Sequence, residues 1–297
     1  MAEPFDRPEV VDAARAWAAS GRRVDVGGRQ VWSARFAADR DVGNPPLLVL
    51  HGFPTCSYDW KPVLPALRAE RDVVLLDVAG FGLSDKPDHR YYGGIGYGGG
   101  ERPDLSNLYV SLEGLKAAAT DPKDPVWQKA LTFINRVQNR SESNDQKWAG
   151  NDGGFAYRPG SNPTEYENGT ASYGGMTAAG LLSLLFAGAD KKDPRVQAAY
   201  KWMTANYTLE FNPGTTKKHG LFYFYNAFAK VMSAYGEDTF VDGNGQRHNW
   251  RNELGQKLLS LQAPDGSWAN RDSNAWWEDR PQLVTAWSVI ALEHVIK

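Results

Sequence analysis

Ser172, Asp265 and His294 are the side chains whose types and order along the chain suit nucleophilic catalysis. A serine can attack a carbonyl when a histidine takes its proton and an acid orients that histidine. Their surroundings favour another role, because Ser172 follows a polar, turn-rich segment, Asp265 lies in a Pro-Asp-Gly turn, and His294 lies on an amphipathic helical stretch. No G-x-S-x-G occurs. We expect Ser172 to begin a helix, and hydrolysis through Ser172 is the alternative.

The first ninety residues have the pattern of a small α/β segment. Residues 8–20 predict a short helix, and residues 22–36 predict a β-hairpin. Leu47–Leu50 and Val73–Leu76 are continuous apolar runs, typical of parallel strands that are buried on both faces. A crossover helix fits between them.

Two motifs in this segment resemble α/β-hydrolases, particularly the epoxide hydrolase and haloalkane dehalogenase branch. The first is L-V-L-H-G-F-P at residues 48–54, and the second is D-V-A-G-F-G-L-S-D-K-P at residues 77–87. The resemblance implies that the first motif is an oxyanion turn in which the backbone N–H of Phe53 is one donor. The glycine of such a turn lets N–H groups face a developing oxyanion. We interpret residues 1–90 as a truncated α/β-hydrolase-like segment.

Residues 91–297 alternate between helical stripes and glycine-rich turns. Stripes beginning near residues 126, 196 and 250 predict one layer of helices. Stripes beginning near residues 105, 175, 221 and 282 predict a second, inner layer, and the segment 175–187 is apolar nearly all round. The pattern is an irregular repeat of helix pairs.

The turns of this repeat resemble a second family. Q-A-P-D-G-S-W at residues 262–268 is similar to the Q-x-x-x-G-x-W core of squalene-hopene and oxidosqualene cyclases. The stretches 92–97, 104–107, 172–177 and 220–225 resemble bacterial proteins with prenyltransferase/squalene oxidase repeats. The resemblance implies a mainly α fold, a partial α/α toroid of helical hairpins, preceded by the incomplete α/β-hydrolase-like sheet. A fusion, a chimera or an assembly artefact would each explain such a chain.

The acids of the repeat segment are the candidates for cyclase-like proton donation. The D-x-D-D motif of squalene-hopene cyclases is absent, and the zinc site of protein prenyltransferases is excluded because the segment has no cysteine. Asp104, Glu278 and Asp279 precede predicted inner helices and are the remaining candidates. Helix N-termini also favour acids through their orphan N–H groups and macrodipole, so capping is the preferred interpretation.

Aromatic residues gather at or near the starts of the predicted inner helices. Such rings could line an apolar cavity and stabilise a carbocation, and the alternative is that they pack helix against helix. The candidate ligand-binding residues are Tyr109, Tyr173, Tyr223, Phe224, Tyr225, Trp277 and Trp287.

Composition limits the partners. The net charge of −2 gives no reason to expect nucleic acid, and Cys56 is the only cysteine. We expect no cofactor, no metal and no integral membrane segment. Charged residues near Met1 interrupt any signal-peptide core, which favours a cytoplasmic location. The incomplete sheet predicts self-association.

Three functions therefore stand as hypotheses. The leading one is a toroid-type protein that binds an apolar small molecule, with isoprenoids as one candidate class, and that lacks the acid and zinc motifs of cyclases and prenyltransferases. The first alternative is an α/β-hydrolase acting on an ester or epoxide through Ser172. The second alternative is a structural or protein-interaction scaffold, since an open helical array exposes a concave surface.

Overall fold

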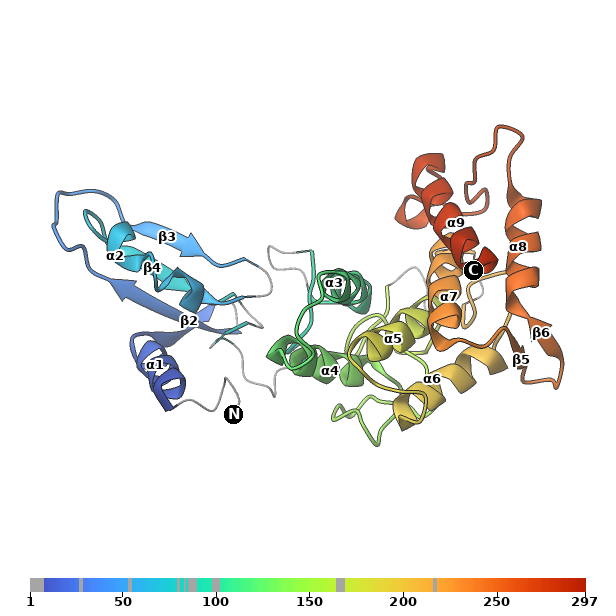
Figure 1. Ribbon diagram of the computed structural model, residues 1–297, viewed down its shortest axis with the longest axis horizontal. Helices are drawn as coiled ribbons and strands as arrows, with labels where there is room; N and C mark the ends of the chain where they lie inside the picture. Colours follow the sequence, from blue (N-terminus) through green and yellow to red (C-terminus); the bar gives the residue numbers. More distant parts are fainter. Residues whose placement is uncertain are drawn as a thin grey trace. The chain divides into compact units, whose positions relative to one another are not determined.

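The structure is a computed structural model that describes residues 8–26, 29–52, 55–78, 81–82, 84, 90–97, 102–163, 169–215 and 218–297. The chain divides into two compact units, Met1–Tyr92 and Gly93–Lys297, called here the first and second units. The first unit holds a small mixed sheet, and the second unit is mainly helical (Figure 1). None of the helices in the described ranges is long and apolar enough to cross a membrane.

The first unit is built around a four-stranded sheet. Its elements are α1 (Pro8–Ala19), β1 (Arg22–Val26), β2 (Arg29–Phe36), β3 (Leu47–Leu50), the short helices η1 (Ser57–Trp60) and α2 (Leu64–Leu67), and β4 (Val73–Leu76). The strand order is β1-β2-β4-β3. The first two pairings are antiparallel and β3 pairs in parallel with β4. The predicted hairpin and both apolar strands are present.

One face of this sheet is packed and the other is not. The packed face contributes Val49, Val73 and Leu75 to a core that also contains Trp17 and Trp32. On β3, which forms one edge of the sheet, Leu48 is 57% exposed and Leu50 is 53% exposed. The expectation that these strands are buried on both faces is therefore wrong, because the described chain supplies no layer that covers Leu48 and Leu50.

The second unit is a two-layer array of helices. The layers are formed by α3 (Leu105–Ala117), α4 (Pro125–Val137), α5 (Gly174–Phe186), α6 (Pro194–Ala205), α7 (Leu221–Tyr235), α8 (Trp250–Leu261) and α9 (Pro281–Ile296). Helices α3, α5, α7 and α9 pack against one another in succession, α6 packs on α5, and α8 packs on α9. These are the helices that the sequence stripes predict, in the predicted layers.

Helix α5 lies in the middle of this array, in contact with α3, α4, α6 and α7. Figure 1 shows α3 and α4 on one side of α5, and α7 and α8 on the other. This position explains why α5 is apolar nearly all round, with its residues 174–184 buried. A hairpin of β5 (Thr239–Val241) and β6 (Arg247–Asn249), which the sequence did not predict, precedes α8.

Gln138 and Trp268 fix the turns that follow α4 and α8. The Gln138 Nε2 group donates to the carbonyl oxygens of Gly153 and Arg195, both at 2.9 Å, and so joins the turn after α4 to the start of α6. Trp268 is buried and its indole N–H donates to the Leu258 carbonyl at 2.7 Å, which holds the turn after α8 against that helix.

Candidate functional site

The starts of α3, α5 and α7 meet in the second unit, where they bring Tyr223 and Glu278 together among the predicted site residues. Ser106 near the start of α3 hydrogen-bonds the Tyr223 hydroxyl on α7 at 3.0 Å. The buried Asn212 accepts from the Gly175 N–H at the start of α5 and donates to the carbonyl of Gly220, which precedes α7. We call this region the inner-helix entrance.

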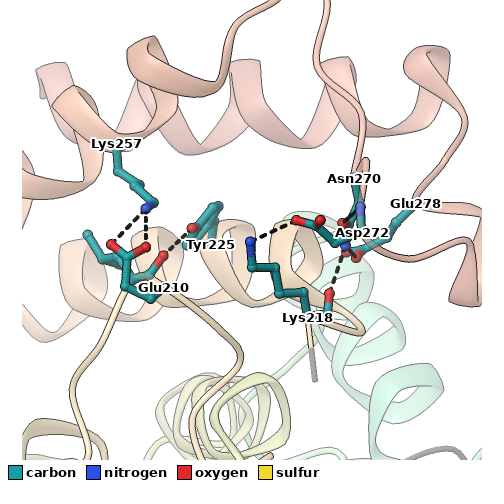
Figure 2. Close-up of polar contacts among 8 residues, drawn as sticks. Glu210, Lys218, Tyr225, Lys257, Asn270, Asp272 and Glu278 are labelled. Carbon is teal, nitrogen blue, oxygen red and sulfur yellow. Dashed lines mark hydrogen bonds and ion pairs between the residues drawn. The ribbon is translucent and has the colours of Figure 1, made fainter. Parts of the chain in front are cut away.

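Glu278 is a buried carboxylate at the inner-helix entrance. Its oxygens accept from the backbone N–H groups of Leu221 at 3.0 Å and of Phe222 and Tyr223 at 2.9 Å. The Asn270 amide donates to it at 2.7 Å, and Figure 2 shows this pair. Burial raises the pKa of Glu278, while these hydrogen bonds act to lower it. Glu278 therefore caps α7, although its own position in the sequence precedes α9.

Asp104 and Asp279, the other two candidate acids, lie in different surroundings. Asp104 is fully buried and is the N-cap of α3, since its side chain accepts from the Asn107 N–H at 2.9 Å. Burial raises the pKa of Asp104. Asp279 is exposed and lies 3.7 Å from Arg280. These contacts favour the capping interpretation for Asp104 and give Asp279 no role in a cavity.

The predicted aromatic residues separate into buried and accessible groups. Tyr109, Tyr173, Phe224 and Tyr225 are buried, and the Tyr225 hydroxyl donates to the Leu209 carbonyl (Figure 2). Burial raises the pKa of Tyr109 and of Tyr225 above the usual range of a phenol. The burial of these four rings favours helix packing as their role.

Tyr223, Trp287 and Trp277 are the predicted rings that keep some contact with solvent. Tyr223 and Trp287 are half-buried and meet edge to face, with ring centroids 5.9 Å apart. Burial raises the pKa of Tyr223. Trp277 is 71% exposed and has a φ of 63°. Tyr223 and Trp287 are thus the rings that could contact a ligand at the inner-helix entrance.

The structure does not join the three residues of the hydrolytic alternative. The Ser172 hydroxyl is buried, donates to Asp152 at 2.7 Å and accepts from the Asn139 amide at 2.9 Å. Asp265 accepts from Ser267 in an exposed turn, and this contact lowers the pKa of Asp265. His294 is half-buried on α9, where burial lowers its pKa. Within the described ranges, no hydrogen bond connects Ser172, Asp265 and His294.

In the first unit, the ends of two neighbouring strands are tied together. The His51 ring, just after β3, interacts through Nδ1 with the Gly52 carbonyl at 2.9 Å and accepts through Nε2 from the Val78 N–H at 2.9 Å. The buried Asp77, just after β4, accepts from the Ser57 N–H at 2.7 Å. Phe53, the expected oxyanion donor, lies outside the described residues.

Some residues that organise these sites carry no clear sequence signal. Asn139, Asp152 and Asn212 are ordinary polar residues in turns, and their partners come from other helix pairs. The hydrolase-like motifs indicated the turns after β3 and β4, but they did not predict the hydrogen bond from the Val78 N–H to His51.

Comparison with known proteins places the similarity in the N-terminal part. A family model described as the alpha/beta hydrolase fold matches residues 45–149. The mesoderm-specific transcript homolog protein of Bos taurus is 32% identical over 136 residues, which is 45% of this chain and 39% of that protein. Epoxide hydrolase 4 of Homo sapiens is 42% identical over 55 residues, or 18% of this chain and 15% of that protein.

The chain therefore spans two fifths or less of the length of these curated relatives. Among solved structures, the haloalkane dehalogenase DatA from Agrobacterium tumefaciens C58 is similar at 23% identity over 42% of this chain and 38% of that chain, with a TM-score of 0.20. The family match extends past the first unit through α3 and α4.

These matches correct the leading expectation from sequence, which was a protein of the cyclase and prenyltransferase toroid type. They support the α/β-hydrolase resemblance and give no support to the cyclase and prenyltransferase resemblance. The N-terminal part of this chain, residues 45–149, is similar to the α/β-hydrolase fold.

Proposed function

We propose that this chain is a hydrolase that acts on an ester or an epoxide. Backbone N–H groups of the turn after β3 would stabilise the oxyanion that forms during hydrolysis. The observation that carries the proposal is the pair of bonds that fix this turn, from Val78 to His51 and from Ser57 to Asp77. They hold the ends of β3 and β4 together, where a hydrolase of the resembled fold positions its oxyanion donors. The hydrolase names among the partial relatives agree with this class.

The proposed activity does not use Ser172. Its hydroxyl donates to Asp152, and no described histidine is in position to take its proton. In serine hydrolases that lose a triad member, the oxyanion hole and substrate binding still give roughly 10³-fold catalysis over water. We therefore expect slow turnover of an activated ester, at about that level.

The test is hydrolysis of p-nitrophenyl acetate by the full chain. Asp77→Ala removes the acceptor for the Ser57 N–H and should reduce the rate by up to about 10²-fold, because the turn after β3 loses a support and its oxyanion donor is displaced. Asp77→Asn keeps one acceptor oxygen and should retain more activity. Asp59→Ala, at an exposed position nearby, is the matched control.

Two results would overturn this assignment. One is a rate equal to that of buffer or of Asp77→Ala under conditions where circular dichroism shows folded protein. The other is loss of activity in Ser172→Ala together with labelling of wild-type Ser172 by a fluorophosphonate, which would restore the Ser172 alternative.

A second proposal concerns the second unit: that it is a partial toroid binding an apolar, isoprenoid-type ligand at the inner-helix entrance. The half-buried Tyr223 and Trp287 rings, which meet edge to face, support it. Retention of squalene by the purified chain, lost in Tyr223→Ala and kept in Phe211→Ala, is the expected result. No retention would leave the scaffold alternative as the better account of the helical array.

A further inference from the structure

A groove of about 610 Å³ with mixed polar and apolar lining lies in the second unit between α6 and the turns that follow α4. One wall is a face of α6 formed by residues three, four and seven positions apart, namely Ala198, Lys201, Trp202 and Ala205, followed by Asn206. The opposite wall consists of Arg140, Glu142, Asn151, Asp152 and Gly153. Its volume lies within the range of small-molecule sites.

The two walls are joined at one end, so the groove is preformed. The Gln138 amide donates both to Gly153 in the turn wall and to Arg195 at the start of α6. Gly153 has a φ of 86°, and a Cβ atom there would stand 2.7 Å from the Ala198 carbonyl oxygen. Only glycine allows this approach of the turn to the helix.

Hydrogen bonds to neighbouring residues hold the polar groups of the turn wall in place. Asp152 accepts from the Gly154 N–H at 2.9 Å and from the Ser172 hydroxyl at 2.7 Å, both through Oδ1. Asn151 accepts through Oδ1 from the N–H and the hydroxyl of Ser141 at 2.9 and 2.8 Å. Ordered side chains lose little further freedom when a ligand binds. Ser172 thus has a role as a support of Asp152.

The charges of the groove are balanced. Arg140 pairs with Glu142, Lys201 forms no ion pair with any residue in the described ranges, and Asp152 adds a second carboxylate. The turn wall therefore carries the donor Arg140 and both carboxylates, and the α6 wall carries the donor Lys201 and the Asn206 amide. A phosphate would meet two carboxylates, whereas a hydroxyl group both donates and accepts and fits such a mixed surface. Trp202 adds an aromatic side chain to the lining.

We propose that this groove binds a small neutral carbohydrate of one or two sugar rings. Sugar hydroxyls would bridge Lys201 and Asp152, and the apolar C–H face of a ring would lie along α6. The site is separate from the hydrolase-type turns of the first unit, so it goes beyond the proposed hydrolytic function.

The experiment is saturation-transfer NMR and calorimetry on the full chain with maltose, cellobiose and trehalose. At least one sugar should receive saturation and bind. Lys201→Ala should weaken binding about tenfold, as expected for the loss of one charge-assisted hydrogen bond. Lys192→Ala, at an exposed position before α6, should leave it unchanged.

A second variant tests the groove without changing its polar groups. Ala205 is exposed in the groove wall, so Ala205→Phe should fill the hollow and abolish binding while circular dichroism and thermal unfolding stay as in wild type. The proposal is overturned if none of the three sugars binds, if Ala205→Phe binds like wild type, or if inorganic phosphate competes with the bound sugar at equal concentration.

Discussion

Glu278 illustrates at the residue scale how much of a site can be inferred from sequence. Its position among acids before a predicted helix favoured a capping role over catalysis. The structure shows a different cap from the expected one, because Glu278 does not cap α9 and instead accepts from N–H groups of α7, more than fifty residues earlier in the chain. Sequence spacing could not identify this partner, because the contact depends on how α7 and the turn before α9 pack.

The stability effect of Glu278 follows from this contact. Glu278→Ala should lower the free energy of unfolding by about 3 kcal/mol, because three buried N–H groups and the Asn270 amide lose their acceptor. Glu278→Gln keeps one acceptor oxygen and should cost less, about 1 kcal/mol. Asp279→Ala, at the exposed neighbouring position, should change the free energy by less than about 0.5 kcal/mol. Urea unfolding followed by circular dichroism measures all three, and equal effects at both positions would contradict the capping role.

At the scale of elements, the apolar stripes located the helices of the second unit. The stripes beginning near residues 126 and 196 correspond to α4 and α6, which Asp124 and Asp193 cap, and Asp193 accepts from the Arg195 N–H at 2.9 Å. The β5–β6 hairpin was missed because its strands have three residues each, too few for an alternating pattern. The left-handed backbone at Trp276 and Trp277 also has no sequence signal, since Trp rarely adopts positive φ.

The Asp193 cap makes a prediction about pH. Its hydrogen bond to the Arg195 guanidinium lowers the pKa of Asp193 below the unfolded value. A lowered folded pKa adds stability above the unfolded pKa of about 4, and this stability is lost as the pH falls through the folded pKa. At pH 7 the free energy of unfolding of wild type should exceed that of Asp193→Asn by about 0.5–1 kcal/mol. This difference should disappear in acid. A difference that is constant from pH 7 to pH 3 in urea titrations would contradict this account.

Two helical glycines give a matched test of packing around α5. A Cβ on Gly180 would stand 2.5 Å from the buried Phe155 ring, whereas a Cβ on Gly114 in α3 would meet no atom within 4 Å. Gly180→Ala should therefore destabilise the chain by about 2 kcal/mol through overpacking. Gly114→Ala should stabilise it by up to about 1 kcal/mol through helix propensity. In thermal unfolding, Gly180→Ala should lower the midpoint temperature and Gly114→Ala should raise it. Equal shifts of the midpoint would mean that Phe155 does not limit the space at Gly180.

At the scale of the whole molecule, the two units differ in how well sequence anticipated them. The helix layers followed from residue periodicity, because each stripe reports its own buried face. The apolar runs at Leu47–Leu50 and Val73–Leu76 predicted strands correctly, and the exposure of Leu48 and Leu50 fits the expected incomplete sheet, although the runs themselves are typical of strands covered on both faces. Continuous apolar strands indicate two covered faces only when the chain supplies both covering layers.

The open sheet face predicts association of the whole chain. Leu48 and Leu50 lie on the edge strand β3, where apolar side chains and unpaired backbone groups favour pairing between molecules. Leu48→Lys combined with Leu50→Lys should shift sedimentation velocity profiles towards a smaller species. Val110→Lys, at an exposed position on α3, is the control. Identical profiles for wild type and the double variant at concentrations up to about 100 μM, well above typical specific affinities, would remove this proposal.

The order of helix contacts in the second unit has a consequence for how the chain acquires its structure during synthesis. The most extensive packing joins helices that alternate along the chain, namely α3 with α5, α5 with α7 and α7 with α9. These contacts close longer loops than contacts between consecutive helices do, and loop closure costs more entropy as the loop lengthens. Each inner helix must therefore wait for the next inner helix to leave the ribosome, whereas the sheet of the first unit has all its strands once β4, which pairs between β2 and β3, is synthesised.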